Sequence, residues 1–278
     1  MGRMGVGDLT IPNILKYPGS KWSIAPWIVN HFPAGYENMH YLEPFFGSGA
    51  VFFTKERSRI ETVNDLDDDV VNLFRVARDR PEELARAVAL TPWARVEYQK
   101  SYDRSSCDDI EKARKFLVRT WQGIGAKTSC ATGWRKNIKN VNGNVPRFHI
   151  SLPDNILETC DRLKHCKGNK IVQIECTDAF DLIERHNTID TLIYADPPYM
   201  RETRSGTIYK HEFTDSDHTR LLENLRAHKG KVVISGYACG LYDEALSDWR
   251  SYETECQTEA AKKERKSFGA TTRPSGRW

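Results

Sequence analysis

The sequence predicts an α/β fold in which a mostly parallel sheet is interrupted by a helical, basic insertion. Short apolar runs alternate with stretches of helical period, which is typical of parallel sheets covered by helices. A glycine-rich turn follows the first of these runs, and acidic residues stand at or near the ends of three of them. The middle of the chain loses this alternation and becomes rich in Lys, Arg, Asn and aromatic residues.

A glycine-rich turn follows the first predicted strand, over residues 41–43. It reads Glu43-Pro44-Phe45-Phe46-Gly47-Ser48-Gly49 and runs into an apolar helix. Glycine permits a tight turn and the close approach of a ligand, and the helix N-terminus that follows favours negative charge. A simple connection from strand to helix would produce the same pattern, so the turn indicates a ligand only together with other motifs.

A second short strand over residues 60–64 ends at Asp65, sixteen residues after Gly49. Nucleotide-binding βαβ units typically place an acid there to bind ribose hydroxyls. The competing role is to cap the helix that we expect to open near Asp67.

The middle of the chain is expected to form the insertion. Helices are predicted over residues 81–90, 93–102 and 108–121, a loop or hairpin over 123–145, and a returning helix over 153–164. Between Lys112 and Arg147 the chain carries nine Lys or Arg and no Asp or Glu, whereas the remainder is net acidic. Charge separated in this way indicates a surface for a polyanion, with a merely solvated basic surface as the alternative.

Several side chains of this segment are candidates for contacting nucleic acid. Trp121, Trp134 and Phe148 lie among the basic residues, and asparagines can hydrogen-bond base edges or form turns. The residues of this segment that are predicted to contact nucleic acid are Arg119, Lys127, Arg135, Lys136, Asn137, Lys139, Asn144 and Arg147.

The tetrapeptide Asp196-Pro197-Pro198-Tyr199 is the most informative motif. It follows an apolar run over residues 191–195, which predicts a buried parallel strand, so it stands at the edge where open α/β sheets bind ligands. Consecutive prolines give a stiff turn without N–H donors. A carboxylate, free carbonyls and an aromatic ring form an acceptor-rich pocket suited to an amino group on a flat ring. An ordinary proline turn with an aspartate cap is the competing interpretation.

The remaining elements continue the alternation. Strands are predicted over residues 170–174 and 231–235, and helices over 215–228 and 241–246. Residues 259–278 are polar and basic.

The order of the motifs resembles one family. Lys16-Tyr17-Pro18-Gly19-Ser20-Lys21, the turn from Glu43 to Gly49, Asn64-Asp65 and Asp196-Pro197-Pro198-Tyr199 occur in the order found in the Dam-like (D12 class) DNA adenine-N6 methyltransferases. The resemblance covers roughly residues 14–249. It implies a Rossmann-like methyltransferase sheet with an inserted, mainly helical DNA-recognition subdomain. It also implies S-adenosyl-L-methionine as the methyl donor and a flipped adenine in double-stranded DNA as the acceptor.

The resemblance further implies three regions. Residues 11–78 and 166–258 would form the catalytic domain that binds S-adenosylmethionine, residues 79–165 the target-recognition insert, and residues 259–278 a basic C-terminal tail. Relatives usually finish with a further hydrophobic strand, and this chain stops at Trp278. The sheet is therefore expected to be truncated or altered at that edge.

Cofactor contacts follow from matching positions. The resemblance assigns the methionine part to the glycine turn, the ribose to Asp65, and the adenine amine to Asp178 with Phe180 nearby. The full set that it implies is Tyr17, Lys21, Glu43, Pro44, Phe45, Gly47, Ser48, Gly49, Asp65, Asp178, Phe180 and Asp196. Lys16 is expected to touch DNA. A helix cap at Asp178 and a solvated side chain at Lys21 are the competing roles.

Catalysis is assigned to Asp196, Pro197, Pro198 and Tyr199. The exocyclic nitrogen of adenine is a poor nucleophile because its lone pair delocalises into the ring. The Asp196 carboxylate and the Pro197 carbonyl would each accept one of its hydrogens, and Tyr199 would stack on the flipped base. The donor already carries an activated methyl group, so neither a metal nor a covalent enzyme intermediate is expected.

Composition limits the alternatives. No segment reaches the length of a membrane span, and the N-terminus lacks the apolar core of a signal peptide. Seven cysteines without such a signal indicate a reducing cytoplasm. The sequence has no Cys-x-x-Cys pair of the kind that would suggest a metal site. No cysteine follows a proline, so the Pro-Cys nucleophile of the cytosine-C5 methyltransferases is missing.

Three other functions stay open at this point. A cytosine-N4 methyltransferase uses the same chemistry, although the order of motifs favours adenine. Methylation of RNA or of a protein glutamine is the second alternative. Glutamine enzymes favour Asn at the position of Asp196, and the basic insert points toward nucleic acid. A non-catalytic DNA-binding relative is disfavoured by the intact tetrapeptide. The resemblance leaves room for a partner restriction endonuclease, and neither the recognition sequence nor the oligomeric state can be predicted.

Overall fold

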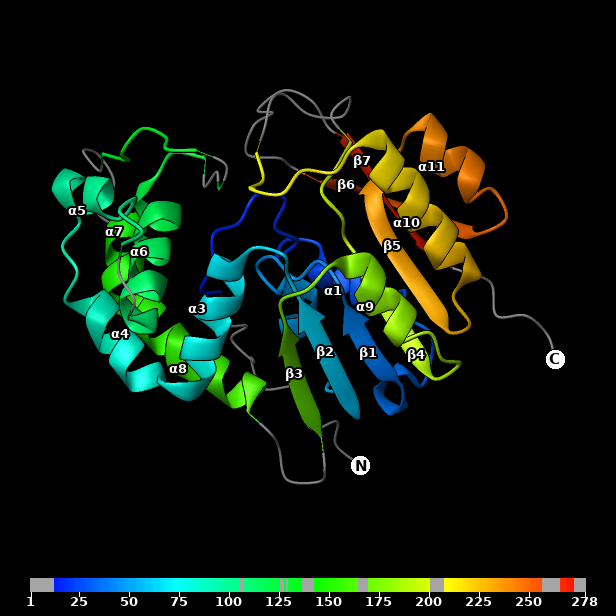
Figure 1. The fold of residues 1–278 in the computed structure, drawn as a ribbon, viewed down its shortest axis with the longest axis horizontal. Coiled ribbons are helices and arrows are strands. Elements are labelled where there is room, and N and C mark those ends of the chain that lie inside the picture. The colour runs from blue at the N-terminus through cyan, green and yellow to red at the C-terminus, as the bar shows by residue number, and fades with distance from the viewer. Residues whose placement is uncertain are drawn as a thin grey trace, which may run out of the picture.

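The computed structural model describes residues 13–105, 108–125, 128, 130–136, 143–164, 170–200, 208–256 and 266–272. These residues form a seven-stranded sheet in the order β3-β2-β1-β4-β5-β7-β6 (Figure 1). The parallel strands are β1 (His40–Glu43), β2 (Ile60–Asn64), β3 (Ile171–Glu175), β4 (Thr191–Ala195) and β5 (Lys231–Tyr237). Two antiparallel strands, β6 (Arg250–Cys256) and β7 (Lys266–Thr272), complete it. The predicted α/β fold with a mostly parallel, Rossmann-like sheet is confirmed.

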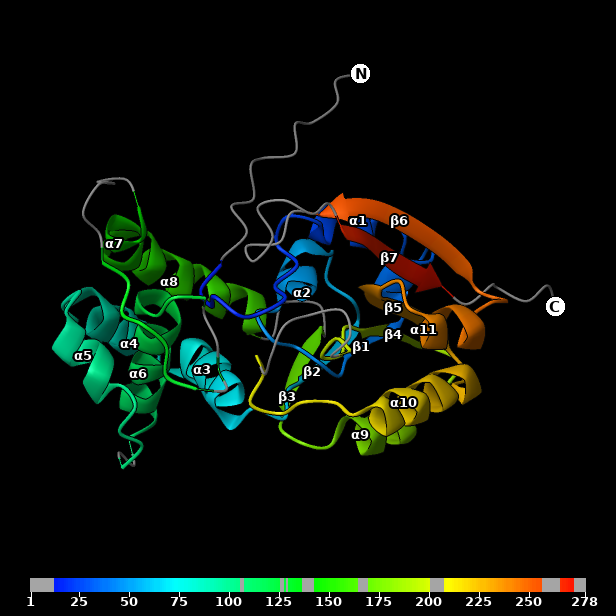
Figure 2. The same cartoon turned by 90° about the horizontal axis from the view of Figure 1, so that it is seen from above.

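Helices cover both faces of the sheet (Figure 2). One face carries α1 (Ala25–Val29) and α2 (Ala50–Thr54), and the other carries α9 (Ala179–Arg185), α10 (Asp215–Ala227) and α11 (Gly240–Ala245). Along β4, Leu192 and Tyr194 join the apolar cluster of the first face, whereas Ile193 and Ala195 join that of the second. Strands buried on both faces must be apolar throughout, which explains the continuous runs in the sequence. In the described part of the chain, no helix combines the length and apolar character needed to cross a membrane.

A group of helices leaves the sheet between β2 and β3. It consists of α3 (Asp68–Asp79), α4 (Pro81–Ala89), α5 (Arg95–Lys100), α6 (Asp109–Gln122), two short turns, α7 (Asn144–Pro146) and η2 (Arg147–Ser151), and α8 (Leu152–Leu163). Pro81 begins α4 at a position where its missing N–H costs nothing, and Asp108 caps α6. The insertion is therefore helical, as predicted, although the expected helix over 93–102 is shorter. A further short turn, η1 (Tyr36–Asn38), precedes β1.

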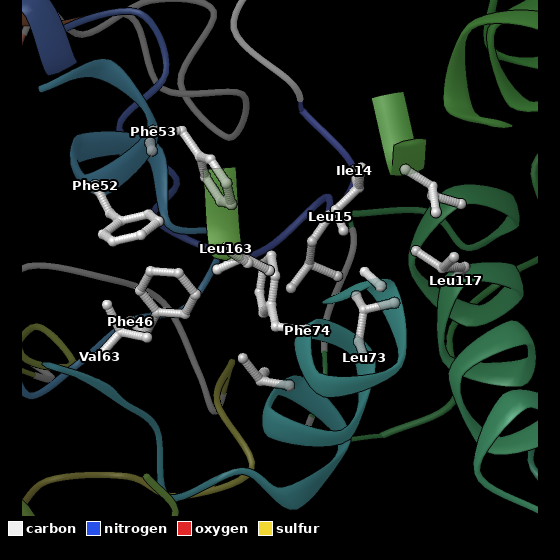
Figure 3. Packing of buried hydrophobic residues seen from close by; sticks show 14 of the residues in the cluster. Ile14, Leu15, Phe46, Phe52, Phe53, Val63, Leu73, Phe74, Leu117 and Leu163 are labelled. Carbon is white, nitrogen blue, oxygen red and sulfur yellow. The ribbon is translucent and has the colours of Figure 1, made fainter. Parts of the chain in front are cut away.

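The insert and the sheet share one apolar core. Ile14 and Leu15, from the segment before β1, are buried in the same cluster as Phe74 of α3 and Leu117 of α6 (Figure 3). Trp121 of α6 donates its indole N–H to the Ile14 carbonyl at 2.9 Å. The N-terminal segment thus fixes the insert beside the sheet.

The prediction for the C-terminal residues was wrong in one respect. Residues 266–272, assigned to a basic tail, form β7, which pairs with both β5 and β6. The short strand was not predicted because lysines and arginines lie on either side of it and make the whole segment look polar. On the side of the sheet that was expected to be truncated or altered, β7 therefore lies between β5 and the edge strand β6. Residues 257–265 and 273–278 lie outside the described ranges, and the other predicted domain boundaries stay predictions.

Candidate active site

One cleft opens at the carboxyl ends of β1, β2 and β4. The space between its walls, which is open to solvent, is about 850 Å³. Parallel pairing brings the ends of the three strands to the same edge of the sheet, where ligands of open α/β sheets bind. The loop over residues 17–21, the start of α9 and the segment over 209–213 complete its walls.

The cleft gathers nearly all of the residues predicted to bind a cofactor. Of these, Gly49 alone is not among the residues that line it. Gly49 instead caps α2 with a φ of 68°, and a Cβ there would stand 2.6 Å from the Phe46 ring and 2.7 Å from that of Phe53. Its role is therefore to let the turn fold, whereas the lining residues are placed to touch a ligand.

Asp65 ties the glycine turn to the end of β2. Its carboxylate accepts the backbone N–H of Gly47 at 2.8 Å and that of Asp67 at 2.9 Å. Burial raises the pKa of Asp65 to about 6, against the lowering effect of these two hydrogen bonds. Asp67, and not Asp65, caps α3. The competing role considered for Asp65 is thus taken by its neighbour, and the Asp65 carboxylate lines the cleft.

Gly47 is required by the shape of this turn. Its φ is 49°, in the left-handed region that favours glycine. A Cβ at this position would lie 3.0 Å from the Tyr17 ring, so Tyr17 covers the turn closely. On the same side, the Ser20 and Ser48 hydroxyls lie 2.9 Å apart and join the N-terminal loop to the turn.

Asp196 stands at the centre of a group of donors. Lys21 Nζ lies 2.6 Å from Oδ2, while the Ser235 hydroxyl donates to Oδ1 at 2.9 Å and the Tyr199 hydroxyl at 3.3 Å. Lys21 is only 6% exposed and Asp196 18%. The solvated role considered for Lys21 is therefore wrong, since its ammonium is held inside the cleft against the carboxylate.

The rest of the tetrapeptide surrounds Asp196 differently. Pro198 lines the cleft, whereas Pro197 and Tyr199 stand beside it. The Tyr199 ring contacts the Tyr237 ring at a centroid distance of 4.7 Å and an angle of 64°, and Lys21 Nζ lies 4.8 Å from its centroid. An aromatic face and a carboxylate thus lie next to each other at the end of β4.

Glu43 is a second carboxyl group on the cleft wall. It is buried and accepts a hydrogen bond from the Tyr41 hydroxyl at 2.7 Å. Burial raises the pKa of Glu43 to about 8; the Tyr41 hydrogen bond opposes this, and the charge of Asp196 adds to it. At neutral pH this carboxyl is therefore largely protonated.

Aromatic rings form the wall near α9. The ring of Phe213 stacks on that of Phe180 at 5.9 Å and 15°, and it meets the ring of Phe45 edge to face at 5.4 Å. Asp178 accepts the backbone N–H groups of Phe180 and Asp181 at 2.9 and 3.2 Å, so it caps α9 while it lines the cleft.

Some lining residues were missing from the predicted set. They are Pro18, Gly19, Ser20, Phe46, Ala50, Val51, Asn64, Leu66, Ala179, Tyr194, Tyr209, His211 and Phe213. Phe213 had a local signal, because Thr214 after it opens α10 with a capping box. Tyr209 and His211 had none, because their placement depends on contacts between distant segments.

The residues predicted to contact DNA differ in how far they are exposed. Lys136 and Arg147 are exposed on the insert, whereas Arg135 is partly buried and donates to the Gly123 carbonyl at 3.3 Å. Lys16 Nζ lies 2.5 Å from Asn144 Oδ1 and 4.1 Å from the centroid of the Trp121 ring, so both Lys16 and Asn144 belong to the junction with the insert. Lys127, Asn137 and Lys139 lie outside the described residues.

The assignment of Arg119 to DNA binding was wrong. Arg119 is 8% exposed, and its guanidinium bonds Asp69 Oδ2 at 2.9 Å and the Ser101 carbonyl. It joins α6 to α3 and α5 inside the insert and is not presented to a ligand.

Comparison with known proteins agrees with this site. A family model described as "D12 class N6 adenine-specific DNA methyltransferase" matches residues 17–263. The chain is 27% identical over 268 residues to the type II methyltransferase M1.LlaDCHI of Lactococcus lactis subsp. cremoris, covering 89% of each chain. It is 25% identical over 242 residues to the DNA adenine methylase of Salmonella typhi, covering 83% of this chain and 82% of the relative.

A solved structure shows a weaker likeness. The rRNA methyltransferase AviRa of Streptomyces viridochromogenes matches with a TM-score of 0.39 and 13% identity, over 92% of this chain and 86% of the other. The family match spans most of the chain and includes the whole cleft. The chain therefore belongs to the D12 class of N6 adenine-specific DNA methyltransferases, and its reaction is the methylation of adenine N6 in DNA.

Proposed function

We propose that the cleft binds S-adenosylmethionine and that Asp196 directs its methyl group to N6 of an adenine flipped out of double-stranded DNA. The observation that carries the proposal is the arrangement at the end of β4. There, a carboxylate held by Lys21 and Ser235 lies beside an aromatic ring and lines the cleft.

The residues of the cleft fit this cofactor. Glu43, Asp65 and Asp178 supply acceptors for its ammonium, ribose hydroxyls and adenine amine. The net negative wall suits a ligand whose ammonium and sulfonium charges exceed the charge of its one carboxylate. Phe45, Phe180 and Phe213 supply an apolar wall for its adenine ring. The backbone of Gly47 approaches the cleft without a side chain in the way.

The chemistry on the acceptor falls to this chain's own groups. When bound, S-adenosylmethionine supplies a methyl group that its sulfonium has already activated. Asp196 and the Pro197 carbonyl accept the two N6 hydrogens and so draw the nitrogen's lone pair out of the ring. Each carboxylate oxygen has two lone pairs, so Oδ2 can accept an N6 hydrogen while it keeps its bond to Lys21. The new N–C bond leaves N6 with one extra proton, which Asp196 is placed to accept.

Reaching the base requires that it leave the duplex. A stacked adenine cannot bring N6 to a cleft at the sheet edge, so the base must rotate out and pay the cost of unstacking. Tyr199 offers the ring on which it stacks. The insert, with Lys136 and Arg147 exposed, contacts the flanking phosphates.

Other attributes rest on the family and the relatives. The type II name of one relative favours a role beside a restriction endonuclease of the same specificity. Such an enzyme works on DNA in the cytoplasm. The cytosine-N4 alternative is not favoured, because the family and the named relatives that act on a stated base are adenine-specific.

The test is methyl transfer from labelled S-adenosylmethionine to unmethylated DNA, with the product nucleosides separated. The proposal expects label in N6-methyladenine, and none in a preparation of Asp196→Ala that still binds the cofactor. Label in N4-methylcytosine would show that the acceptor base is cytosine and not adenine. Full transfer by Asp196→Ala would show that Asp196 has no role in the mechanism.

A further inference from the structure

Ser235 lies behind the catalytic carboxylate on the neighbouring strand. In the parallel pairing of β4 with β5, Ile234 stands opposite Ala195, so Ser235 is level with Asp196. Ser235 is 0% exposed and is not among the residues that line the cofactor cleft. Any effect that it has on the reaction is therefore expected to pass through its hydrogen-bond partners, Asp196 and Tyr194.

The hydrogen bonds around Ser235 have a fixed direction. Its hydroxyl has one proton and donates it to Asp196 Oδ1 at 2.9 Å, because an ionised carboxylate can only accept. The Tyr194 hydroxyl lies 2.9 Å from Ser235 Oγ, so it must be the donor in that contact. Burial, aided by the charge of Asp196, raises the pKa of Tyr194 well above its usual range, so Tyr194 keeps its proton.

The two carboxylate oxygens of Asp196 have different hydrogen-bond partners. Oδ1 is turned toward the sheet by Ser235 and accepts a longer bond from Tyr199, while Oδ2 meets Lys21, which lines the cleft. Without such bonds, the terminal torsion of an aspartate is broad and roughly two-fold. A transfer step that needs one oxygen at a set position depends on removing that freedom.

We propose that Ser235, backed by Tyr194, is a positioning residue that holds the Asp196 carboxylate with Oδ2 directed at the acceptor amine. The inference rests on the proposed role of Asp196. The sequence around Ser235 does not predict this positioning role, because the role depends on the register between β4 and β5.

The expected effect is on the rate of transfer and not on binding. Losing a hydrogen bond to a charged group should slow the single-turnover rate of Ser235→Ala by about 10- to 100-fold. The dissociation constants for S-adenosylmethionine and for DNA should stay within about twofold, because Ser235 touches neither. Tyr194→Phe removes only the second bond of the chain and should slow the rate by about 2- to 10-fold.

The experiment measures single-turnover transfer by the full chain at saturating S-adenosylmethionine and unmethylated DNA. Ser235→Thr keeps the hydroxyl and should recover most of the rate. Ser58→Ala is the matched control, because Ser58 is equally buried and donates to the Tyr36 carbonyl, away from the cleft. It should transfer at the rate of the unmodified enzyme.

The outcomes separate this inference from the proposed function. A rate within twofold for Ser235→Ala, with Asp196→Ala inactive, overturns the inference alone. Transfer by Asp196→Ala overturns the proposed function first. The third outcome is a loss of transfer rate in Ser235→Ala that comes with weaker cofactor binding and a lower melting temperature, and that Ser235→Thr does not reverse. This outcome would show that Ser235 is merely structural, and it also overturns the inference.

Discussion

The cleft and the helical insert use charged residues in opposite ways. In the cleft, Lys21, Glu43 and Asp196 point from three segments into one space that they share with a ligand. In the insert, many charged side chains form ion pairs with other residues of the protein. Arg119 bonds Asp69, and Arg114 bonds Glu97 at 3.1 Å and Glu111 at 2.6 Å.

This difference shows what a local motif can and cannot predict. A residue at the end of a strand has its position set by the backbone of the sheet, so the motif and the site coincide. A basic residue on a helix faces solvent or a neighbouring helix depending on how the helices pack. The count of basic residues in the insert is therefore a poor guide to which of them meet DNA.

Replacing the aromatic ring beside Asp196 should give a large loss on the cleft side of the comparison. Tyr199→Ala removes the surface on which the flipped base stacks and should lower the transfer rate by about 100-fold. Tyr199→Phe keeps the ring and loses only the 3.3 Å bond to Asp196, so it should stay within a few-fold. Single-turnover rates of the two variants check this; similar losses in both would assign the effect to the hydroxyl.

Glu43 should make stability depend on pH. Its pKa is about 8 in the folded enzyme and its ordinary value is 4.5. Between these values the folded chain keeps a proton that the unfolded chain has lost. The contribution to stability is thus full below pH 4.5 and is lost as pH rises toward 8, by roughly 1 kcal/mol for each unit.

Denaturant unfolding at several pH values between 5 and 8 measures this slope. Glu43→Gln should flatten the curve relative to the unmodified enzyme, and Glu223→Gln, an exposed carboxyl on α10, should not. Parallel curves for the Glu43 variant and the unmodified enzyme would contradict the account of its burial.

The glycine turn should tolerate no side chain at Gly47. Gly47→Val places a Cβ against the Tyr17 ring and forces a positive φ on a branched residue, so the turn must shift. Affinity for S-adenosylmethionine should fall by about 10-fold, as calorimetry can measure. Gly240→Val is a fair control, because a Cβ there meets nothing within 4 Å. Unchanged affinity in the Gly47 variant would show that the cofactor does not bind against this turn.

The smallest effects are expected in the insert, where two basic residues should behave differently. Arg119→Met should lower the free energy of unfolding by about 1–3 kcal/mol and leave DNA affinity unchanged. Lys136→Met should leave stability unchanged, weaken DNA binding a few-fold, and make its dependence on salt shallower by about 0.9 in the log–log slope. If Arg119→Met alters the salt slope, the distinction between its buried pair and the exposed Lys136 fails.

Much of the fold and the cleft could be predicted from sequence, and the reasons are local. Apolar runs of five residues, glycines in a tight turn and acids at strand ends each leave a signal within a few positions. Tyr209, Ser235 and β7 could not be predicted with the same means. Their roles depend on segments that meet only in the folded chain, as when β7 pairs with β5 and Ser235 reaches Asp196.

The most direct test of the division between chemistry and recognition is a comparison of binding and transfer in Asp196→Asn. The variant keeps the size of the side chain and removes its charge. We expect it to bind S-adenosylmethionine and DNA within about threefold of the unmodified enzyme, while single-turnover transfer to adenine falls by about 1,000-fold. Transfer at a comparable rate, or a loss explained by weaker binding alone, would contradict the assignment of the chemical step to Asp196.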